Sequence, residues 1–204
     1  MLDKCVGGLV LCGGRSGRMG ADKAWLPFGE ECLLQRVVRV VKEIAGPVVV
    51  AARQGQVLPP LPGGVAVARD VYEGVGPLAG LSVGLAALED SCETTLVVAC
   101  DHPLITPGFL ASLIRSLGRD DSAIVPMNAG RHYALLAAYR VSVRRYVDAN
   151  VKARRYRLVD FLSDCNATMI DMADLCDDAV DRGVFMNVNE PTTYEQALDV
   201  LGLR

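Results

Sequence analysis

Short apolar segments that alternate with helix-like stretches constrain the fold of this chain more than any other feature. The apolar segments cover residues 5–12, 48–52, 65–70, 96–101 and 123–127. Helical periodicity or helix-start signals lie between them, at residues 31–44, 77–88 and 107–117. Continuously apolar strands that alternate with helices indicate a parallel sheet covered on both faces. We therefore predict an α/β fold, a three-layer sandwich with a mostly parallel central sheet.

The last third of the chain is less regular. It contains an apolar run at residues 134–139, candidate strands at 166–172 and 184–189, and a terminal helix at 191–201. A chain of 204 residues is long enough to bury one full hydrophobic core. We expect a single domain over residues 1–204.

Composition excludes several classes of function. The net charge of −3 argues against a dedicated nucleic-acid binder, and no apolar run approaches the length of a membrane span. The first twelve residues are too short for a signal peptide, so we expect a cytoplasmic protein. Seven cysteines, none spaced as C-x-x-C, are best explained as buried free thiols.

A glycine-rich stretch with several cations follows the first predicted strand. Residues 13–20 include four glycines, Arg15 and Arg18, and Lys23 comes soon after. Glycine lets backbone N–H groups approach phosphate oxygens closely, and the cations neutralise the remaining charge. The alternative is a flexible turn with surface arginines, but the preceding buried strand and the closing lysine favour phosphate binding. The stretch is neither a Walker loop nor a dinucleotide fingerprint, and its basic character suggests a nucleoside triphosphate.

Two aspartates end predicted strands, Asp70 and Asp101. Ligands bind at the carboxyl ends of parallel strands, so we expect both aspartates and the glycine-rich stretch at one edge of the sheet. Mg²⁺ needs only one or two carboxylates beside waters and phosphate oxygens, and Asp101 is our candidate ligand. Asp101 is equally placed to be a turn residue, and Asp70 is either a turn former or an acceptor for nucleoside N–H and O–H groups.

No pairing of a nucleophile with a base is evident. Ser16 lacks the nucleophile elbow, and His102 and His132 are the only histidines. Phosphoryl or nucleotidyl transfer needs no protein nucleophile, because alignment and charge neutralisation supply the catalysis. A basic cluster fits either a solvated helix face or a cradle for an anionic second substrate. The cluster consists of Arg140, Arg144, Arg145, Lys152, Arg154, Arg155 and Arg157.

The glycine-rich stretch matches a known signature. Residues 11–20 read LCGGRSGRMG and are followed by Asp22-Lys23. This resembles the motif L-x-G-G-x-S-x-R-M-G-x-D-K of the molybdenum cofactor guanylyltransferases. The resemblance continues in residues 70–81, 100–103 and 187–191 and so extends from end to end of the chain. It implies a Rossmann-like, nucleotide-diphospho-sugar transferase-like fold, with a nucleotide-binding half (1–120) and an acceptor-binding half (121–204).

The resemblance also implies a reaction. GMP would pass from Mg²⁺-bound GTP to the terminal phosphate of molybdopterin carrying molybdenum, and pyrophosphate would leave. Arg18, Lys23 and Asp101 would be catalytic, and Asp101 and Asn189, or less favourably Asn187, would bind the Mg²⁺. The implied GTP-binding residues are Leu11, Cys12, Gly13, Gly14, Lys23, Asp70 and Asp101. The basic cluster would receive the pterin phosphate, and the product would be handed to molybdoenzyme chaperones.

Three positions depart from the family pattern. Ala52-Arg53 stand where a nucleotide-contacting asparagine is common, Cys12 replaces a common alanine, and His132-Tyr133 replaces His-Pro. These departures concern nucleoside recognition rather than the reaction class. Cytidylyltransferase relatives tend to read Ala-Ala-Gly at residues 12–14. The missing β-carbon at Gly13 leaves room for a purine edge, so we predict guanine over cytosine.

Other functions would share most of these features. A nucleotidyltransferase that uses CTP, or one that acts on a sugar or polyol phosphate, would keep the glycine-rich stretch, Lys23 and Asp101. A non-catalytic nucleotide-binding partner of molybdoenzyme maturation would have the fold without turnover. The presence of Arg18, Lys23 and Asp101 favours an enzyme, because a protein that only binds nucleotide would not need to keep these residues.

Overall fold

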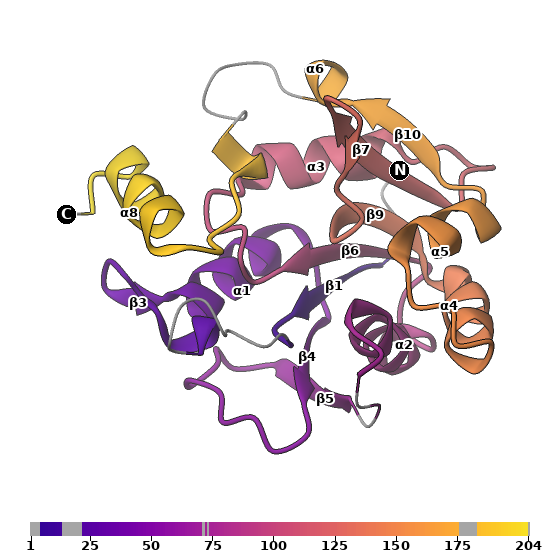
Figure 1. Cartoon of the computed structure of the whole chain (residues 1–204), viewed down its shortest axis with the longest axis horizontal. Helices are drawn as coiled ribbons and strands as arrows, with labels where there is room; N and C mark the ends of the chain where they lie inside the picture. The colour runs from indigo at the N-terminus through magenta and orange to yellow at the C-terminus, as the bar shows by residue number, and fades with distance from the viewer. Residues whose placement is uncertain (1–4, 14–21, 71, 73, 176–182, 204) are drawn as a thin grey trace.

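The central sheet of the protein lies between two layers of helices (Figure 1). The computed structural model describes residues 5–13, 22–70, 72, 74–175 and 183–203. The sheet has the strand order β10-β7-β9-β6-β1-β4-β5, and β8 pairs with β7 off this path. Its strands are β1 (Val6–Leu11), β4 (Val48–Arg53), β5 (Val65–Asp70), β6 (Thr94–Ala99), β7 (Ala123–Asn128), β8 (Arg131–His132), β9 (Leu136–Arg140) and β10 (Thr168–Asp171). Only β8 and β9 run antiparallel to their neighbours in this sheet, which confirms the prediction of a mostly parallel sheet.

The helices divide between the two faces of the sheet. Those described are α1 (Leu33–Ile44), α2 (Pro77–Leu88), α3 (Pro107–Ser116), α4 (Arg144–Lys152), α5 (Leu158–Asp164), α6 (Met172–Leu175) and α8 (Pro191–Val200). Short 3-10 turns are η1 (Lys23–Trp25), η2 (Val141–Val143) and η3 (Gly183–Phe185). Helices α1 and α3 pack on one face, and α2, α4 and α5 pack on the other (Figure 1). Both faces of the central strands are therefore buried, which explains their continuous apolar sequence.

Two glycines let helices approach strand β1 closely. A β-carbon on Gly84 of α2 would lie 2.2 Å from Leu9 Cδ1, and one on Gly8 would lie 2.4 Å from Val41 Cγ1. Neither distance is compatible with a real side chain, so the packing on both faces of β1 depends on glycine. The glycine-rich sequence begins at the end of this closely packed strand.

The predicted strand at 184–189 is wrong. Residues 183–185 form η3, and residues 186–189 have no regular structure. The apolar side chains of this segment are nevertheless buried, Val184 and Phe185 in one hydrophobic cluster and Val188 in another. The segment is therefore apolar because it packs into the core, although its backbone does not join a sheet. The apolar run at 134–139 gives the antiparallel strand β9, whose direction the sequence pattern does not reveal. Strand β5 is the outermost strand at its edge, and Val67 is exposed, contrary to the expectation of a covered strand.

The end of the chain packs against an early hairpin. Strands β2 (Pro27–Phe28) and β3 (Glu31–Cys32) pair, so the predicted helix at 31–44 begins only at Leu33. Phe28 and Leu33 share a buried cluster with Val188 and with Ala197 of α8. Figure 1 shows α8 beside this hairpin. The chain after η3 is therefore held near the segment that carries Lys23. None of the described helices is long and apolar enough to cross a membrane.

Candidate active site

The carboxyl ends of β1, β4 and β6 meet at one edge of the sheet. Strand β1 pairs in parallel with both β4 and β6. Beyond its last residue, Cys12 N donates to Ala51 O at 2.8 Å, and Cys100 N donates to Leu11 O at 2.9 Å. The start of the glycine-rich stretch and Asp101 are thereby placed on neighbouring strands. This is the edge where the rule for parallel sheets locates a ligand.

Lys23 reaches Asp101 and Asn189 from the turn η1. Asp22 caps this turn, because its Oδ1 accepts a hydrogen bond from Ala24 N at 3.1 Å. The Lys23 ammonium donates to Asn189 Oδ1 and lies 3.5 Å from Asp101 Oδ2. The side chains of Lys23 and Asp101 are 19% and 20% exposed, so their attraction is less screened than that of a surface pair. Three of the residues proposed from sequence are thus brought together.

One carboxylate oxygen of Asp101 has no hydrogen-bond donor in the described part of the chain. Its Oδ1 is buried, has no hydrogen-bond partner among the residues that the structure describes, and lies 4.0 Å from His102 Nε2. Asn187 Oδ1 is a second buried oxygen for which the described residues provide no hydrogen bond. Such oxygens are costly unless a donor or a cation satisfies them, and carboxylate and amide oxygens suit Mg²⁺. Within the described residues, no group of three or more His, Cys, Asp or Glu side chains could hold a metal. The residues fit an ion that takes its other ligands from waters and phosphates.

His102 lies directly after Asp101 and is buried. Its Nδ1 donates to Val184 O at 3.1 Å when the ring proton is on that nitrogen. Burial lowers the pKa of the imidazole, and the nearby Asp101 carboxylate offsets this only in part. Val188 N also donates to Asp101 O at 2.8 Å. These two contacts anchor the segment that presents Asn189 to Lys23.

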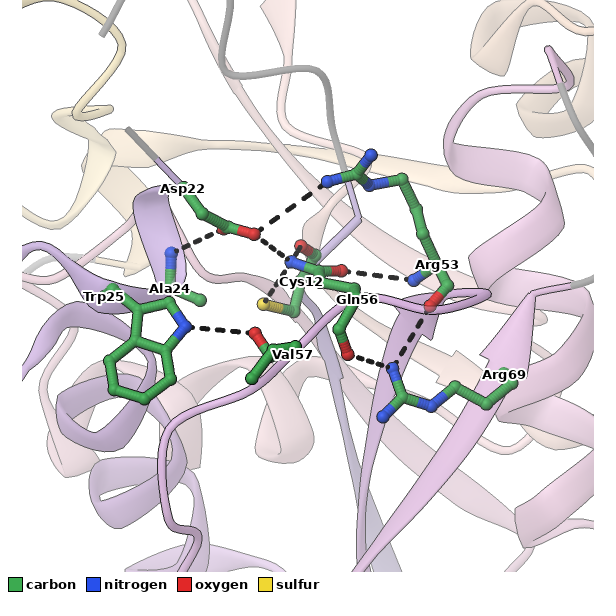
Figure 2. A network of polar contacts seen from close by, with 8 residues as sticks. All are labelled: Cys12, Asp22, Ala24, Trp25, Arg53, Gln56, Val57 and Arg69. Carbon is green, nitrogen blue, oxygen red and sulfur yellow. Dashed lines mark hydrogen bonds and ion pairs between the residues drawn. The ribbon is translucent and has the colours of Figure 1, made fainter. Parts of the chain in front are cut away.

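A second polar network joins the end of β1 to Asp22 (Figure 2). The buried Gln56 donates from Nε2 to Cys12 O at 3.2 Å and to Asp22 Oδ2 at 2.9 Å. Its Oε1 accepts from Arg53 N at 3.2 Å, and the Arg53 guanidinium lies 3.9 Å from Asp22 Oδ2. Sequence analysis missed Gln56, because it lies in the proline-rich loop at 54–64, outside any motif or periodic segment.

The residues expected to contact the nucleoside lie at the start of this network. Leu11 and Cys12 are buried, and Gly13 is exposed. Both backbone groups of Cys12 already have partners, the N–H in Ala51 O and the carbonyl in Gln56 Nε2. Only the second lone pair of that carbonyl is left for a nucleoside. Gly14 and Arg18 lie outside the described residues. The six described cysteines are free thiols as predicted, and all are buried except Cys5, which is exposed contrary to the prediction.

Asp70 is not part of the cluster around Lys23. It ends β5, and strands β4 and β1 separate β5 from β6, which leads to Asp101. Its Oδ1 accepts from Tyr72 N at 2.7 Å, the contact of a turn former. No contact joins Asp70 to Lys23 or Asp101 within the part of the chain that the structure describes. Asp70 and Asp101 thus lie at the same edge of the sheet, as expected, with two strands between the strands that lead to them.

The structure divides the basic cluster. Arg140 pairs in register with Thr94, the first residue of β6, so it lies at the edge opposite Asp101. Arg144 forms ion pairs with Glu89 and Asp148, and Arg155 donates to Asp164 Oδ1 at 3.2 Å. These arginines are engaged with surface carboxylates, as expected of a solvated helix face.

The fold and the residues gathered at this edge define an α/β nucleotidyltransferase. Residues 8–165 match the family model described as "MobA-like NTP transferase domain". A Mycobacterium marinum protein named "Probable molybdenum cofactor guanylyltransferase" is 38% identical over 170 residues, which are 82% of this chain and 84% of the relative. The chain therefore belongs to the MobA-like NTP transferase family, as the sequence motif predicted.

Solved structures agree on the fold. The crystal structure of molybdopterin-guanine dinucleotide biosynthesis protein A from Archaeoglobus fulgidus matches with a TM-score of 0.79 and 20% identity, covering 96% of this chain and 98% of that one. A Thermus thermophilus 2-C-methyl-D-erythritol 4-phosphate cytidylyltransferase matches with a TM-score of 0.69 and 15% identity, covering 95% and 98%. A Mycobacterium tuberculosis protein in complex with manganese matches with a TM-score of 0.61 and 16% identity, covering 96% and 98%. The predicted nucleotide-diphospho-sugar transferase-like fold is confirmed.

Proposed function

We propose that this protein transfers GMP from Mg²⁺-bound GTP to the terminal phosphate of molybdopterin carrying molybdenum, with release of pyrophosphate. The observation that carries the proposal is the contact of Lys23 with both Asp101 and Asn189 at the carboxyl end of the sheet. The choice of GTP as donor and of molybdopterin as acceptor is based on the relatives named as molybdenum cofactor guanylyltransferases.

Each residue has a role that follows from its charge. An oxygen of the acceptor phosphate attacks the α-phosphorus of GTP, and the bond from that phosphorus to the bridging oxygen of the β-phosphate breaks. Lys23 binds the triphosphate and neutralises charge as pyrophosphate leaves, and Arg18 does the same from the glycine-rich stretch. Asp101 and Asn189 would hold the Mg²⁺, and the bound ion would neutralise negative charge on the phosphates. No protein nucleophile is needed.

The remaining assignments rest on the same family relationship. Leu11, Cys12, Gly13 and Gly14 bind the guanine nucleoside, and Asp70 contributes to nucleotide binding. Residues 1–120 form the nucleotide-binding half, and residues 121–204 form the half that accepts the pterin. The protein acts in the cytoplasm and hands its product to molybdoenzyme chaperones.

Two other reactions are compatible with the same cluster. A cytidylyltransferase shares the fold, and a nucleotidyltransferase for sugar or polyol phosphates would use Lys23 and Asp101 in the same way. The absence of a β-carbon at Gly13 favours the larger guanine base over cytosine.

A pyrophosphate-release assay distinguishes these reactions. GTP and CTP are each supplied with Mg²⁺ and with molybdopterin, a sugar phosphate or a polyol phosphate. We expect release with GTP and the molybdopterin acceptor. Release with another combination would identify one of the alternatives, and no release with any acceptor would indicate a nucleotide-binding partner without turnover.

A further inference from the structure

Gln56 ties together the two residues that flank the glycine-rich sequence, Cys12 and Asp22 (Figure 2). We propose that Gln56 is a positioning residue, which fixes Lys23 in the active site by holding Asp22 against the end of β1. The effect of Gln56 on turnover rests on the proposed function. The structural consequence, the placement of η1, does not.

A glutamine is the side chain that this position requires. Two acceptors, Cys12 O and Asp22 Oδ2, need donors, and one donor, Arg53 N, needs an acceptor. A side-chain amide provides two N–H donors and a carbonyl oxygen, so one orientation of Gln56 satisfies all three groups. Because Gln56 is only 8% exposed, water cannot readily replace these hydrogen bonds.

Asp22 transmits this restraint to Lys23. One carboxylate oxygen of Asp22 accepts from Ala24 N and starts η1, and the other accepts from Gln56 Nε2. Lys23 is the first residue of that turn. Moving Asp22 therefore moves the backbone from which the Lys23 ammonium reaches Asp101.

The loop that carries Gln56 holds η1 at its other end as well. Trp25, the last residue of η1, donates from Nε1 to Val57 O at 3.0 Å. The loop is itself fixed by Arg69 of β5, whose Nη1 donates to Gln56 O at 2.8 Å and to Arg53 O at 3.1 Å. The edge strand β5 thus supports the loop, and the loop supports η1.

The test replaces the amide by a carboxylate. In Gln56→Glu, the introduced carboxylate would face the Asp22 carboxylate and the Cys12 carbonyl, with the guanidinium of Arg53 and the Cys12 thiol also nearby. The ionised side chain repels both acceptors, whereas the protonated form restores one donor. The effect of Gln56→Glu should therefore grow as the pH rises. Gln54→Glu is the matched control, because Gln54 is exposed two residues away.

Trp25 provides a readout that requires no substrate. It is the only tryptophan of the chain and lies in η1 directly after Ala24. We expect a reversible, pH-dependent change in its fluorescence emission in Gln56→Glu, and no such change in the wild type or Gln54→Glu. We also expect kcat for pyrophosphate release in Gln56→Glu to fall about tenfold or more at neutral pH and to recover towards acidic pH.

Two further variants keep the proposal falsifiable. Gln56→Met removes all three bonds without a charge, so its altered Trp25 emission and lower kcat should not depend on pH. Asp22→Asn keeps a capping side chain and adds an amide donor. Combined with Gln56→Glu, it should partly restore the wild-type Trp25 emission and kcat. Identical Trp25 emission in Gln56→Glu, Gln56→Met and Gln54→Glu at every pH would overturn the proposal. Absence of pyrophosphate release by the wild type would overturn the proposed function alone.

Discussion

The ammonium nitrogen of Lys23 lies 3.5 Å from Oδ2 of Asp101, and Asn189 Oδ1 accepts a hydrogen bond from the same ammonium. The three residues come from the turn after the glycine-rich stretch, from the end of β6 and from the segment before α8. The fold therefore brings a cation, a carboxylate and an amide oxygen to one point at the edge of the sheet.

Removing either charge should abolish most of the activity. Lys23→Ala and Asp101→Ala should each lower kcat at least about a hundredfold, because each removes a charge contact of the transition state. Lys42→Ala, an exposed lysine of α1, serves as the control and should keep the wild-type rate. Near-normal turnover in Lys23→Ala or Asp101→Ala would contradict the proposed site.

Gly13→Ala should change the base preference without changing the fold. A β-carbon at this position would meet Arg53 Cγ at 3.6 Å, which is an ordinary contact. It would reduce the space that we assign to the purine edge. We expect a lower ratio of kcat/KM for GTP to that for CTP and an unchanged melting temperature. An unchanged ratio would show that Gly13 does not determine the base.

The packing of α2 on β1 should tolerate no side chain at Gly84. Its β-carbon would overlap Leu9, so Gly84→Ala should lower the free energy of unfolding by about 1–3 kcal/mol. Gly108→Ala is the matched control on α3, where the nearest atom outside its neighbours would be Thr106 Oγ1 at 3.9 Å. Urea denaturation should show an unchanged or slightly higher midpoint for Gly108→Ala. Equal midpoints for the two variants would refute the close approach.

Tyr139 should make the protein sensitive to alkali. Burial holds the pKa of its phenol well above the ordinary value of 10.0. The unfolded chain loses the phenolic proton as the pH rises past that ordinary value, whereas the folded chain retains it. The free energy of unfolding is therefore unaffected by this group below the ordinary pKa and falls progressively as the pH rises above it.

Tyr139→Phe isolates this contribution. The variant loses the hydrogen bond from the hydroxyl to Ala134 O and should be less stable by about 1 kcal/mol at neutral pH. Above pH 10.0 its free energy of unfolding should decline less steeply than that of the wild type. The exposed Tyr72 provides the control Tyr72→Phe, which should follow the wild type at every pH. Parallel curves for Tyr139→Phe and the wild type would contradict the assignment.

The sequence predicts the central strands well for a physical reason. Residues of β1, β4 and β6 are buried on both faces, so their apolar runs are continuous and easily distinguished from amphipathic helices. Periodicity carries no information on strand direction, so the antiparallel direction of β9 is not predictable from it. The apolar residues at 184–188 resemble a strand, but their burial is satisfied by packing against helices.

The candidate site is predictable only in part, for similar reasons. Lys23 and Asp101 are marked by a motif and by the end of a buried strand. Asp70 carries the same mark, but only the strand order reveals its separation from Asp101. Gln56 contacts Cys12 and Asp22, which are distant from it in sequence, so no local sequence pattern indicates its positioning role.

The fate of the α-phosphate of GTP tests the central claim most directly. The protein is incubated with Mg²⁺, molybdopterin carrying molybdenum, and GTP labelled at the α-phosphate. We predict that the label moves to the pterin product while an equal amount of unlabelled pyrophosphate appears, and that Lys23→Ala and Asp101→Ala both lose this transfer. Label that remains in GTP, or that is released as free GMP whether or not the acceptor is present, would contradict the account.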